Sequence, residues 1–542
     1  MLLALLSYVM PTRAHDDIRT YSTNNRPLSP DFSTSFHPRL TTIFQQLDAI
    51  APRFVMGSGD IQILTSPEDF YATLKKKIAM ANSRIFLSSL YIGKAQTELF
   101  ECIEQALHKN ENLRVDILTD ALRGTREAPD VSSASKLAEL VQKFGKHRVD
   151  VRMYHTPHLS GLAKVVTPKR LNEGYGLQHM KLYGFDDEVI LSGANLSQDY
   201  FTNRQDRYYI FKNKPITDYY FKIQNAVSKL SYQVVPSKLK QGFYLDWPTS
   251  NKSCEPHLNL QRFISDSSYL LEPLLKQHEL TSFEQYDDHE KFDTIVYPVS
   301  QLSPLMNPNN DISTEKPAIL RLLSYLDSPK IKWWFTAGYF NMLPQIQERL
   351  LNSKATGAVI TAAPQANSFY KSQGVSYYLP EAYLLFAKKF LQQVYKMGKS
   401  SLITVYEWKN GVVNTPGGWS YHAKGLWMTV PEEEVPSITV VGSSNYTKRA
   451  YSHDLETNAI VITKSPELKL AMKQEIDNIM THAHQMELSE FEPKPVESSL
   501  NEKPELDEKG EPVKPKIQYE IDENRKISSG VRLAVKILGG KL

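Results

Sequence analysis

The chain has 542 residues, which at the usual domain size is enough for roughly two or three domains. Its 41% hydrophobic and 23% charged residues are typical of a globular protein, and no apolar run is long enough to predict a membrane-spanning helix. A formal net charge of only +3 argues against a nucleic-acid partner. Cys102 and Cys254 are too few for a disulfide framework, and without a Cys-x-x-Cys pair they predict no zinc site.

Residues 1–56 predict a leader that is mostly disordered, because prolines are frequent and apolar residues show little periodicity. Several arginines and many Ser and Thr residues in this leader are typical of a mitochondrial transit segment, whereas Asp16 and Asp17 are not. A plain disordered tail is the alternative.

Residues 57–234 alternate strand and helix patterns and form a first repeat unit. The expected elements are a strand at 60–64, a helix at 66–81, a strand at 84–93, a helix at 97–109, a strand at 113–119, a helix at 132–144 and a strand at 149–154. Ser66 and Pro67 supply a cap and a first-turn proline for the first helix. This alternation predicts an α/β fold with helices covering a mixed sheet.

Residues 293–485 repeat the same order after a connector at 235–292, in which we expect one helix near 258–278. The expected elements of this second unit are a strand at 293–301, a helix at 316–326, a strand at 330–341, a helix at 343–351, a strand at 355–361, a helix at 381–397 and a strand at 402–408. The chain therefore contains two copies of one α/β unit.

Residues 486–525 form a charged, proline-rich linker that cannot bury enough apolar area to become ordered. Residues 526–542 predict a basic amphipathic helix. Its apolar face would be formed by Ile527, Val531, Ala534, Val535 and Leu538. Such a helix could dock on the protein core or lie on a membrane surface.

The first repeat ends in a polar motif, in which His179, Lys181 and Asp186 are spaced H-x-K-x-x-x-x-D. Residues two apart on a strand share a face, so the imidazole and the ammonium group should project into one site. A small-residue turn that ends at Asn195 follows, and Asp206 comes eleven residues later.

The second repeat carries a similar motif, with His422 and Lys424 in H-x-K spacing and Asn445 at the end of a small-residue turn. Glu456 again follows this Asn by eleven residues. A lone H-x-K pair would be a weak signal, but two copies of a His, Lys, Asn and acid set argue against chance.

The two motifs resemble the HKD motifs of the phospholipase D superfamily. The segment SGANLSQDYFTNRQDRY and the H-x-K-G of the second motif resemble, more narrowly, the eukaryotic mitochondrial phosphatidylglycerophosphate synthases, over about residues 57–484. The resemblance implies two phospholipase D-like repeats packed about a pseudo-twofold axis. It also implies a peripheral enzyme of the mitochondrial inner membrane that converts CDP-diacylglycerol and glycerol 3-phosphate into phosphatidylglycerophosphate and CMP, on the route to phosphatidylglycerol and cardiolipin.

Neither motif alone has enough groups for phosphoryl chemistry, but the two face to face would hold one phosphate. Lys181 and Lys424 would neutralise its oxygens, and Asn195 and Asn445 would donate hydrogen bonds. One imidazole would attack phosphorus to give a phosphatidyl-histidine, and the other would protonate the leaving oxygen. The lysines supply the positive charge, so we expect neither a metal nor a cofactor.

The two halves differ at the position of the motif's Asp. Thr429 stands there in the second half, so Asp186 can orient only the first half, and we place the nucleophile on His179. Asp206 and Glu456 are the candidates for holding the imidazole of the opposite half through its other nitrogen.

The phosphate of the acceptor calls for arginine forks. Arg123 and Arg126 follow a predicted buried strand and are our first candidates, and Arg204 and Arg207 beside the first motif are the second pair. Solvated loop arginines are the alternative for either pair. Two other functions remain open at this point, a hydrolase of the same superfamily and an inactive scaffold that kept the fold.

Overall fold

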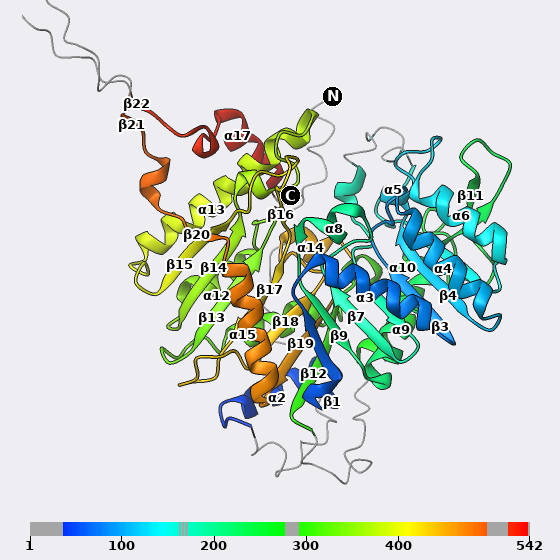
Figure 1. Cartoon of the computed structure of the whole chain (residues 1–542), viewed down its shortest axis with the longest axis horizontal. Helices are drawn as coiled ribbons and strands as arrows, with labels where there is room; N and C mark the ends of the chain where they lie inside the picture. The colour runs from blue at the N-terminus through cyan, green and yellow to red at the C-terminus, as the bar shows by residue number, and fades with distance from the viewer. Residues whose placement is uncertain are drawn as a thin grey trace, which may run out of the picture.

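The computed structural model describes residues 36–161, 164, 167, 172–276, 292–495 and 519–539. In this part of the chain two large mixed sheets lie side by side, each with helices packed on its faces (Figure 1). Within the described residues no helix is both long and apolar enough to cross a membrane.

Each large sheet has nine strands. The first runs β11 (Phe243–Asp246), β10 (Tyr232–Pro236), β5 (Val149–Tyr154), β4 (Arg114–Asp120), β3 (Arg84–Ser88), β6 (Leu182–Phe185), β7 (Glu188–Ser192), β9 (Tyr208–Phe211) and β2 (Ile61–Leu64). The second runs β20 (Ala483–Gln485), β15 (Ile403–Trp408), β14 (Thr356–Ala362), β13 (Lys332–Ala337), β17 (Lys424–Met428), β18 (Ile438–Gly442), β19 (Glu456–Thr463), β12 (Thr294–Gln301) and β1 (Phe54–Met56).

The two sheets have the same strand order from β10 to β2 and from β20 to β12. In each, three parallel strands are followed by antiparallel ones, since β3 pairs parallel to β4 and antiparallel to β6, and β13 does the same with β14 and β17. The predicted α/β fold with two equivalent repeats is therefore confirmed.

The helices of the first repeat are α3 (Pro67–Met80), α4 (Thr97–Lys109), α5 (Ala121–Gly124), α6 (Ser133–Phe144), α8 (Gln198–Thr202) and α9 (Lys214–Ser228). Those of the second are α11 (Glu315–Leu323), α12 (Pro344–Asn352), α13 (Leu379–Lys396), α14 (Lys448–Ser452) and α15 (Pro466–Met480). The side chain of Ser66 accepts the N–H of Asp69 and caps α3, as its position in the sequence predicts. Gly145 ends α6 at a φ of 77°, a left-handed conformation that favours glycine.

A central core joins the two repeats. It contains apolar side chains from the inner faces of both sheets together with those of α9 and α15. The hydroxyl of Tyr220 on α9 donates to the carbonyl of Asn458 on β19 at 2.9 Å. Because this shared core is packed and buried, the two halves form one body and their motifs are held at a fixed separation.

The N-terminal part of the structure corrects the predicted leader. α2 (Leu40–Asp48) buries Leu40, Phe44 and Leu47 against the second repeat, and β1 pairs with β12. Residues 36–56 are thus a structural part of the second repeat. The sequence signal was weak because this single short helix packs through a few apolar residues. Residues 1–35, including the predicted transit segment, lie outside the described residues.

The connector is also corrected. β10 and β11 extend the first sheet, so this repeat reaches Asp246, and α10 (Leu260–Leu275) buries Phe263 and Leu271 in the central core. Residues 277–291 lie outside the described residues.

The predicted linker begins too early. Met486 and Phe491 are buried in the core of the second repeat, whereas residues 496–518 lie outside the described residues. The C-terminal helix α17 (Ser529–Leu538) forms as predicted and docks through Val531 and Val535 on Ala382 and Leu385 of α13.

Candidate functional site

Both motifs lie at the same edge of their sheets. β6 runs antiparallel to β3, and its first residue, Leu182, pairs with Ser88, the last residue of β3. In the second repeat Lys424 pairs with Ala337, the last residue of β13. Each histidine precedes these pairs by two or three residues and therefore stands beyond the carboxyl end of a parallel strand, where α/β proteins commonly bind ligands.

Backbone hydrogen bonds tie each motif to the other repeat. The N–H of His179 donates to the carbonyl of Leu455 at 3.0 Å, and the N–H of His422 donates to the carbonyl of Gln205 at 2.9 Å. In both cases the accepting residue directly precedes an acidic residue. The main chain thereby places an acid of one repeat beside the imidazole of the other.

The side chains complete two crossed pairs. Nδ1 of His179 lies 2.9 Å from Oε1 of Glu456, and Nδ1 of His422 lies 2.7 Å from Oδ2 of Asp206. All four side chains are buried or nearly so. The structure thus brings these four residues together across the repeat boundary, in the arrangement that we expected from the spacing.

Two buried lysines stand beside the imidazoles. Nζ of Lys181 donates to the carbonyl of His179 at 2.6 Å, and Nζ of Lys424 lies 2.8 Å from Nδ1 of His422 and 3.6 Å from Asp206. Gly193 makes this approach possible, because a Cβ at this position would lie 2.3 Å from Nζ of Lys424.

Burial governs the protonation of the imidazoles. Burial, and then the charge of Lys181, lower the pKa of His179. Burial and the charge of Lys424 also lower the pKa of His422, although its hydrogen bond with Asp206 acts to raise it. In the unliganded site both rings therefore favour the neutral form, which a nucleophile requires, whereas a ring that acts as a general acid has to take up a proton when an anionic phosphate binds. Burial also lowers the pKa of Lys181, and a bound phosphate anion would favour its charged form.

The two acids differ in protonation. Burial raises the pKa of Glu456 to about 7, although Lys181 and Ser443 act in the opposite direction. Burial also acts to raise the pKa of Asp206, but the charge of Lys424 and the hydrogen bond with His422 outweigh it and lower that pKa. The carboxylate that holds His422 is thus ionised at neutral pH, while the one that holds His179 titrates there.

The two asparagines lie differently from each other. Asn195 accepts the N–H of Leu90 at 3.2 Å, and its amide donates to the hydroxyl of Tyr200 at 3.1 Å. That hydroxyl lies 3.4 Å from Nε2 of His422, so Asn195 reaches the imidazole through Tyr200. Asn445 has a buried Oδ1 for which the described residues offer no hydrogen-bond partner.

Sequence reasoning missed the groups that make the two sides of the site unlike. The rings of Tyr200 and Tyr339 stand edge-on to His422, with centroids 5.2 and 5.3 Å away. On the other side Asp454 accepts the N–H of Leu177, two residues before His179, and pairs with Arg449 at 3.2 Å. The sequence does contain a signal for this difference. The acid of the first half follows a basic residue in R-Q-D at 204–206, whereas the acid of the second half follows an acidic residue in D-L-E at 454–456.

The structure corrects the role of Asp186. It lies beyond the far end of β6, where its carboxylate accepts the N–H groups of Asn82, Ser83 and Arg84 at the start of β3. It is thus separated from the site by the length of β6, at least about 10 Å. Thr429 does the same work in the second repeat, since its hydroxyl accepts the N–H of Lys332 at the start of β13. The Asp position is therefore structural in both halves and gives no reason to call them unequal.

The structure also corrects the predicted role of Arg207, which is too deeply buried to reach a substrate. It is almost fully buried, pairs with Glu475 at 2.8 Å and donates to the carbonyl of Val440. Its neighbour Arg204 donates to Ser420 and Asp199, both at 2.9 Å, with its guanidinium over the ring of Tyr200. The second pair of sequence candidates therefore consists of one residue of the repeat interface and one residue on the His422 side.

Arg123 and Arg126 stand at the edge of the His179 side. Arg123 lies over the ring of Tyr91, with its central carbon 4.1 Å from the ring centroid. Arg126 pairs with Glu173, whose backbone carbonyl also accepts from Arg449 at 3.0 Å. Arg126, Glu173 and Arg449 thus form a chain that ends at Asp454 beside the first motif.

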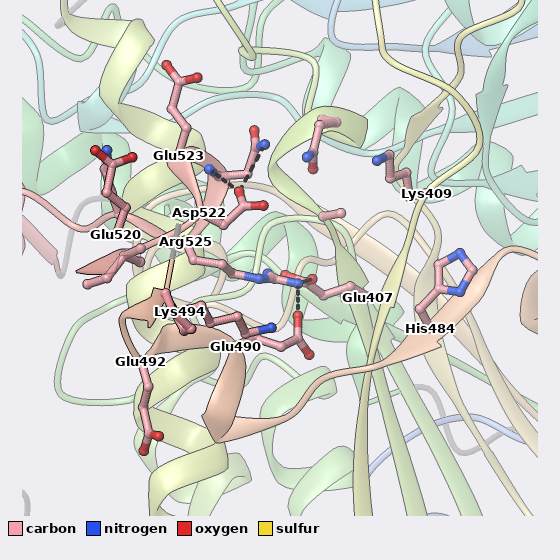
Figure 2. A pocket seen from close by; sticks show the side chains of 16 residues that line it. Glu407, Lys409, His484, Glu490, Glu492, Lys494, Glu520, Asp522, Glu523 and Arg525 are labelled. Atoms are coloured by element: carbon pink, nitrogen blue, oxygen red, sulfur yellow. Dashed lines mark hydrogen bonds and ion pairs between the residues drawn. The ribbon is translucent and has the colours of Figure 1, made fainter. Parts of the chain in front are cut away.

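In the described part of the chain no group of His, Cys, Asp and Glu residues has the arrangement of a metal site. A cavity of about 850 Å³ opens away from the motifs, between β15, β20 and the C-terminal segment (Figure 2). Glu407, Glu490 and Arg525 line it, and none of the motif residues does.

No family model matches the chain, but curated proteins and solved structures do. The chain is 48% identical over 490 residues, 89% of its length and 88% of the relative's, to a CDP-diacylglycerol–glycerol-3-phosphate 3-phosphatidyltransferase of Saccharomyces pastorianus. A protein of the same name from Saccharomyces cerevisiae is 46% identical over 95% of both chains. The Mus musculus protein, named as mitochondrial, is 32% identical over 83% of this chain and 82% of its own. A phosphatidylserine synthase of Haemophilus influenzae has a TM-score of 0.62 at 19% identity, covering 83% of this chain and 92% of its own, which shows a shared fold.

Proposed function

This chain belongs to the CDP-diacylglycerol–glycerol-3-phosphate 3-phosphatidyltransferase family, and from that premise we propose that it transfers the phosphatidyl group of CDP-diacylglycerol to glycerol 3-phosphate. The products are phosphatidylglycerophosphate and CMP. We place the enzyme in mitochondria, as the names of its vertebrate relatives suggest, and at the surface of the inner membrane. The observation that carries the proposal is the crossed pairing of two imidazoles with two carboxylates in one buried site.

In the first step Nε2 of His179 attacks phosphorus, and the bond from phosphorus to the CMP oxygen breaks. His422 enters this step as the imidazolium, protonated on Nε2 when the anionic substrate binds, and gives that proton to the leaving oxygen. The ionised Asp206, 2.7 Å from Nδ1, stabilises the charged ring before the transfer. Lys181 and Lys424 offset the charge on the phosphoryl oxygens. The product of this step is a phosphatidyl-histidine.

His179 is the nucleophile in this scheme because of its free nitrogen. Among the described residues Nε2 of His179 has no hydrogen-bond partner, whereas Nε2 of His422 faces the hydroxyl of Tyr200. Asp186 gives no reason to prefer either ring, because it lies at the far end of β6.

In the second step a hydroxyl of glycerol 3-phosphate gives its proton to His422 as its oxygen attacks phosphorus. The bond from phosphorus to Nε2 of His179 breaks, and the imidazole returns to its neutral form. General acid and base catalysis of this kind supplies about 10²–10⁴-fold in rate. Positioning of the acceptor and stabilisation of charge must supply the remainder.

The test is an assay of the purified protein with CDP-diacylglycerol, with and without glycerol 3-phosphate. We expect CMP and phosphatidylglycerophosphate to appear together only when the acceptor is present, and His179→Ala to abolish both the turnover and the covalent intermediate seen by mass spectrometry. Release of phosphatidic acid at the same rate without acceptor would indicate a hydrolase, and absence of CMP in every condition would indicate a scaffold. Label on His422 instead of His179 would reverse the assignment of the nucleophile.

A further inference from the structure

The C-terminal helix α17 has two apolar sides. Val531 and Val535 are buried against α13, while Leu533 and Ile537 face outward with 62% and 65% of their surface exposed. The charged residues of this helix are both basic, Arg532 and Lys536, and both are exposed. An outer face of this composition is unusual for a helix that ends in water, because the side away from the core is normally polar.

The helix is held in this orientation by contacts at both ends. Before it, the guanidinium of Arg525 lies between the carboxylates of Glu407 and Glu490, 2.5 Å from each (Figure 2). The N–H of Ser528 donates to Glu381 of α13. After it, the carbonyl of Gly539 accepts the side-chain amide of Asn341 at 2.6 Å. The helix cannot rotate to hide Leu533 and Ile537 without breaking these contacts and exposing the two valines.

The C-terminal end of α17 is connected to the His422 side of the candidate site. Asn341, which holds the end of the helix, lies two residues after Tyr339, whose ring is edge-on to His422 at 5.3 Å. Tyr339 stacks on Tyr383 at the start of α13, with centroids 5.4 Å apart. Figure 1 shows α17 and α13 toward the same edge of the molecule as β16 (Ser420–Tyr421), which directly precedes His422.

Further exposed aromatic and basic groups lie on α13, the helix on which α17 packs, and directly before it. Tyr377 and Tyr378 come directly before α13 and are about half exposed. Lys389 of α13 is exposed. Burial is the larger cause that lowers the pKa of Lys388, and the nearby charge of Arg532 lowers it further, while Glu492 acts to raise it. Repulsion among these cations is relieved by a negatively charged surface.

We propose that the face formed by Leu533, Ile537, Tyr377 and Tyr378 docks on the surface of an anionic phospholipid bilayer. The leucine and isoleucine would enter the acyl boundary, the tyrosines would lie at headgroup level, and the basic residues would contact lipid phosphates. The proposal rests on the proposed function, because a substrate with two acyl chains must reach His179 and His422 from a membrane. Docking by this face holds the site beside the bilayer in which that lipid lies.

The size of the effect follows from the transfer of the two side chains. Moving one Leu or Ile side chain from water into an apolar phase changes a partition coefficient by roughly tenfold to a hundredfold. Both residues are already partly shielded, so we expect the pair to contribute about tenfold to a hundredfold in vesicle binding. The basic residues should contribute only to anionic vesicles, and less at high salt.

The test is flotation of the purified full chain with vesicles of phosphatidylcholine, with and without phosphatidylglycerol. We expect Leu533→Asp combined with Ile537→Asp to weaken binding to anionic vesicles at least about tenfold. Arg532→Glu combined with Lys536→Glu should abolish the preference for anionic vesicles. Leu470→Asp is the matched control, since this leucine of α15 is 53% exposed and lies outside the proposed face; it should bind as the wild type does.

Activity separates this proposal from the proposed function. In detergent micelles the Leu533 and Ile537 variant should keep the wild-type rate with CDP-diacylglycerol, while on vesicles its rate should fall with its binding. An inactive wild type would contradict the proposed function and leave the flotation result to decide the docking face. Wild-type flotation of the double variant would overturn the proposal, and so would a change from dimer to monomer in that variant with no change in flotation, because this face would then bind a second copy of the chain.

Discussion

At the residue scale the two halves of the site are alike in geometry and unlike in charge. Each imidazole is held by an acid of the other repeat, but Glu456 titrates near neutral pH and Asp206 does not. The residue two positions before each acid adds to the difference, since Arg204 stands on the side of His422 and Asp454 on the side of His179. This contrast, and not Asp186, suits one ring to attack and the other to transfer protons.

The pKa of Glu456 leads to a test by pH. Below about pH 7 this carboxyl is neutral and withdraws less of the Nδ1 proton of His179, so the ring becomes a weaker nucleophile. We expect kcat to fall as the pH drops through about 7. Glu456→Gln should lower kcat by about 10²–10⁴-fold and remove that limb of the profile. Asp206→Asn should also be slow but should keep the limb, and a limb that persists in Glu456→Gln would contradict the assignment.

The same group affects stability in a definite direction. Its folded pKa of about 7 lies above the ordinary value of 4.5, so the folded state holds the proton more tightly than the unfolded chain. The stabilisation is complete below pH 4.5 and is lost as the pH rises to about 7. The melting temperature of Glu456→Gln relative to wild type should therefore be higher at pH 8 than at pH 5.

The arginines at the rim bear on the acceptor. Arg126 and Arg449 both bind Glu173 on the His179 side. There a dianionic phosphate would take the place of the Glu173 carboxylate as the partner of Arg126. We expect Arg126→Ala to raise the KM for glycerol 3-phosphate by at least about tenfold, with a smaller change for CDP-diacylglycerol, and to release some phosphatidic acid to water. Arg123→Ala should act in the same sense. If Arg204→Ala alone changes the acceptor KM, the acceptor lies on the His422 side instead.

At the element scale the hairpins β6–β7 and β17–β18 hold the two motifs in position. At one end of each hairpin a polar residue accepts backbone N–H groups at the start of a central strand, and the other end leads to the histidine and lysine of the motif. The two hairpins reach the same place although the second is lengthened between Met428 and Ile438, because the extra residues lie at the far end.

This arrangement predicts a change of stability without loss of chemistry. Asp186→Ala leaves three backbone N–H groups without their carboxylate, in a partly exposed setting where the loss should be about 1–2 kcal/mol. Denaturant unfolding should show this loss, and kcat below the melting temperature should stay within about twofold of wild type. Since the pKa of Asp186 is lowered, against burial, by the N–H groups that it accepts, this contribution should disappear at pH values below its ordinary 3.8. A large fall in kcat in a fully folded variant would restore Asp186 to the site.

At the scale of the whole molecule the site exists only at the junction of the two repeats. The buried pair of Arg207 and Glu475 crosses that junction, and Tyr209 and Trp427 both donate to the same carboxylate. Gly425 is required beside it, because a Cβ there would lie 1.8 Å from Nη1 of Arg207. The contacts that hold the two repeats together therefore also hold the two motifs in place.

Removing one partner of this pair should be costly. Arg207→Met leaves Glu475 charged and buried, which we expect to destabilise the protein by about 3–5 kcal/mol in denaturant unfolding. Lys143→Met breaks an exposed pair with Glu104 and should change stability by less than about 1 kcal/mol. If Arg207→Met unfolds as the wild type does but binds glycerol 3-phosphate poorly, the arginine reaches the substrate and the interface role is wrong.

The sequence by itself determined the features that depend on residues close together in the chain. Periodicity, caps and the repeat of H-x-K with its Asn and acid predicted two equivalent α/β units and the pairing of each histidine with the acid of the other half, because these signals recur at fixed spacing in both halves. Only the tertiary structure decided what depends on distant contacts. It placed α2 and β1 on the second repeat, moved Asp186 away from the site and buried Arg207, since a strand length separates residues near in sequence and a shared core joins residues far apart. It also showed that Leu533 and Ile537 face outward. An amphipathic pattern alone does not predict this, because α17 has apolar residues on two sides and its packing on α13 decides which side is buried.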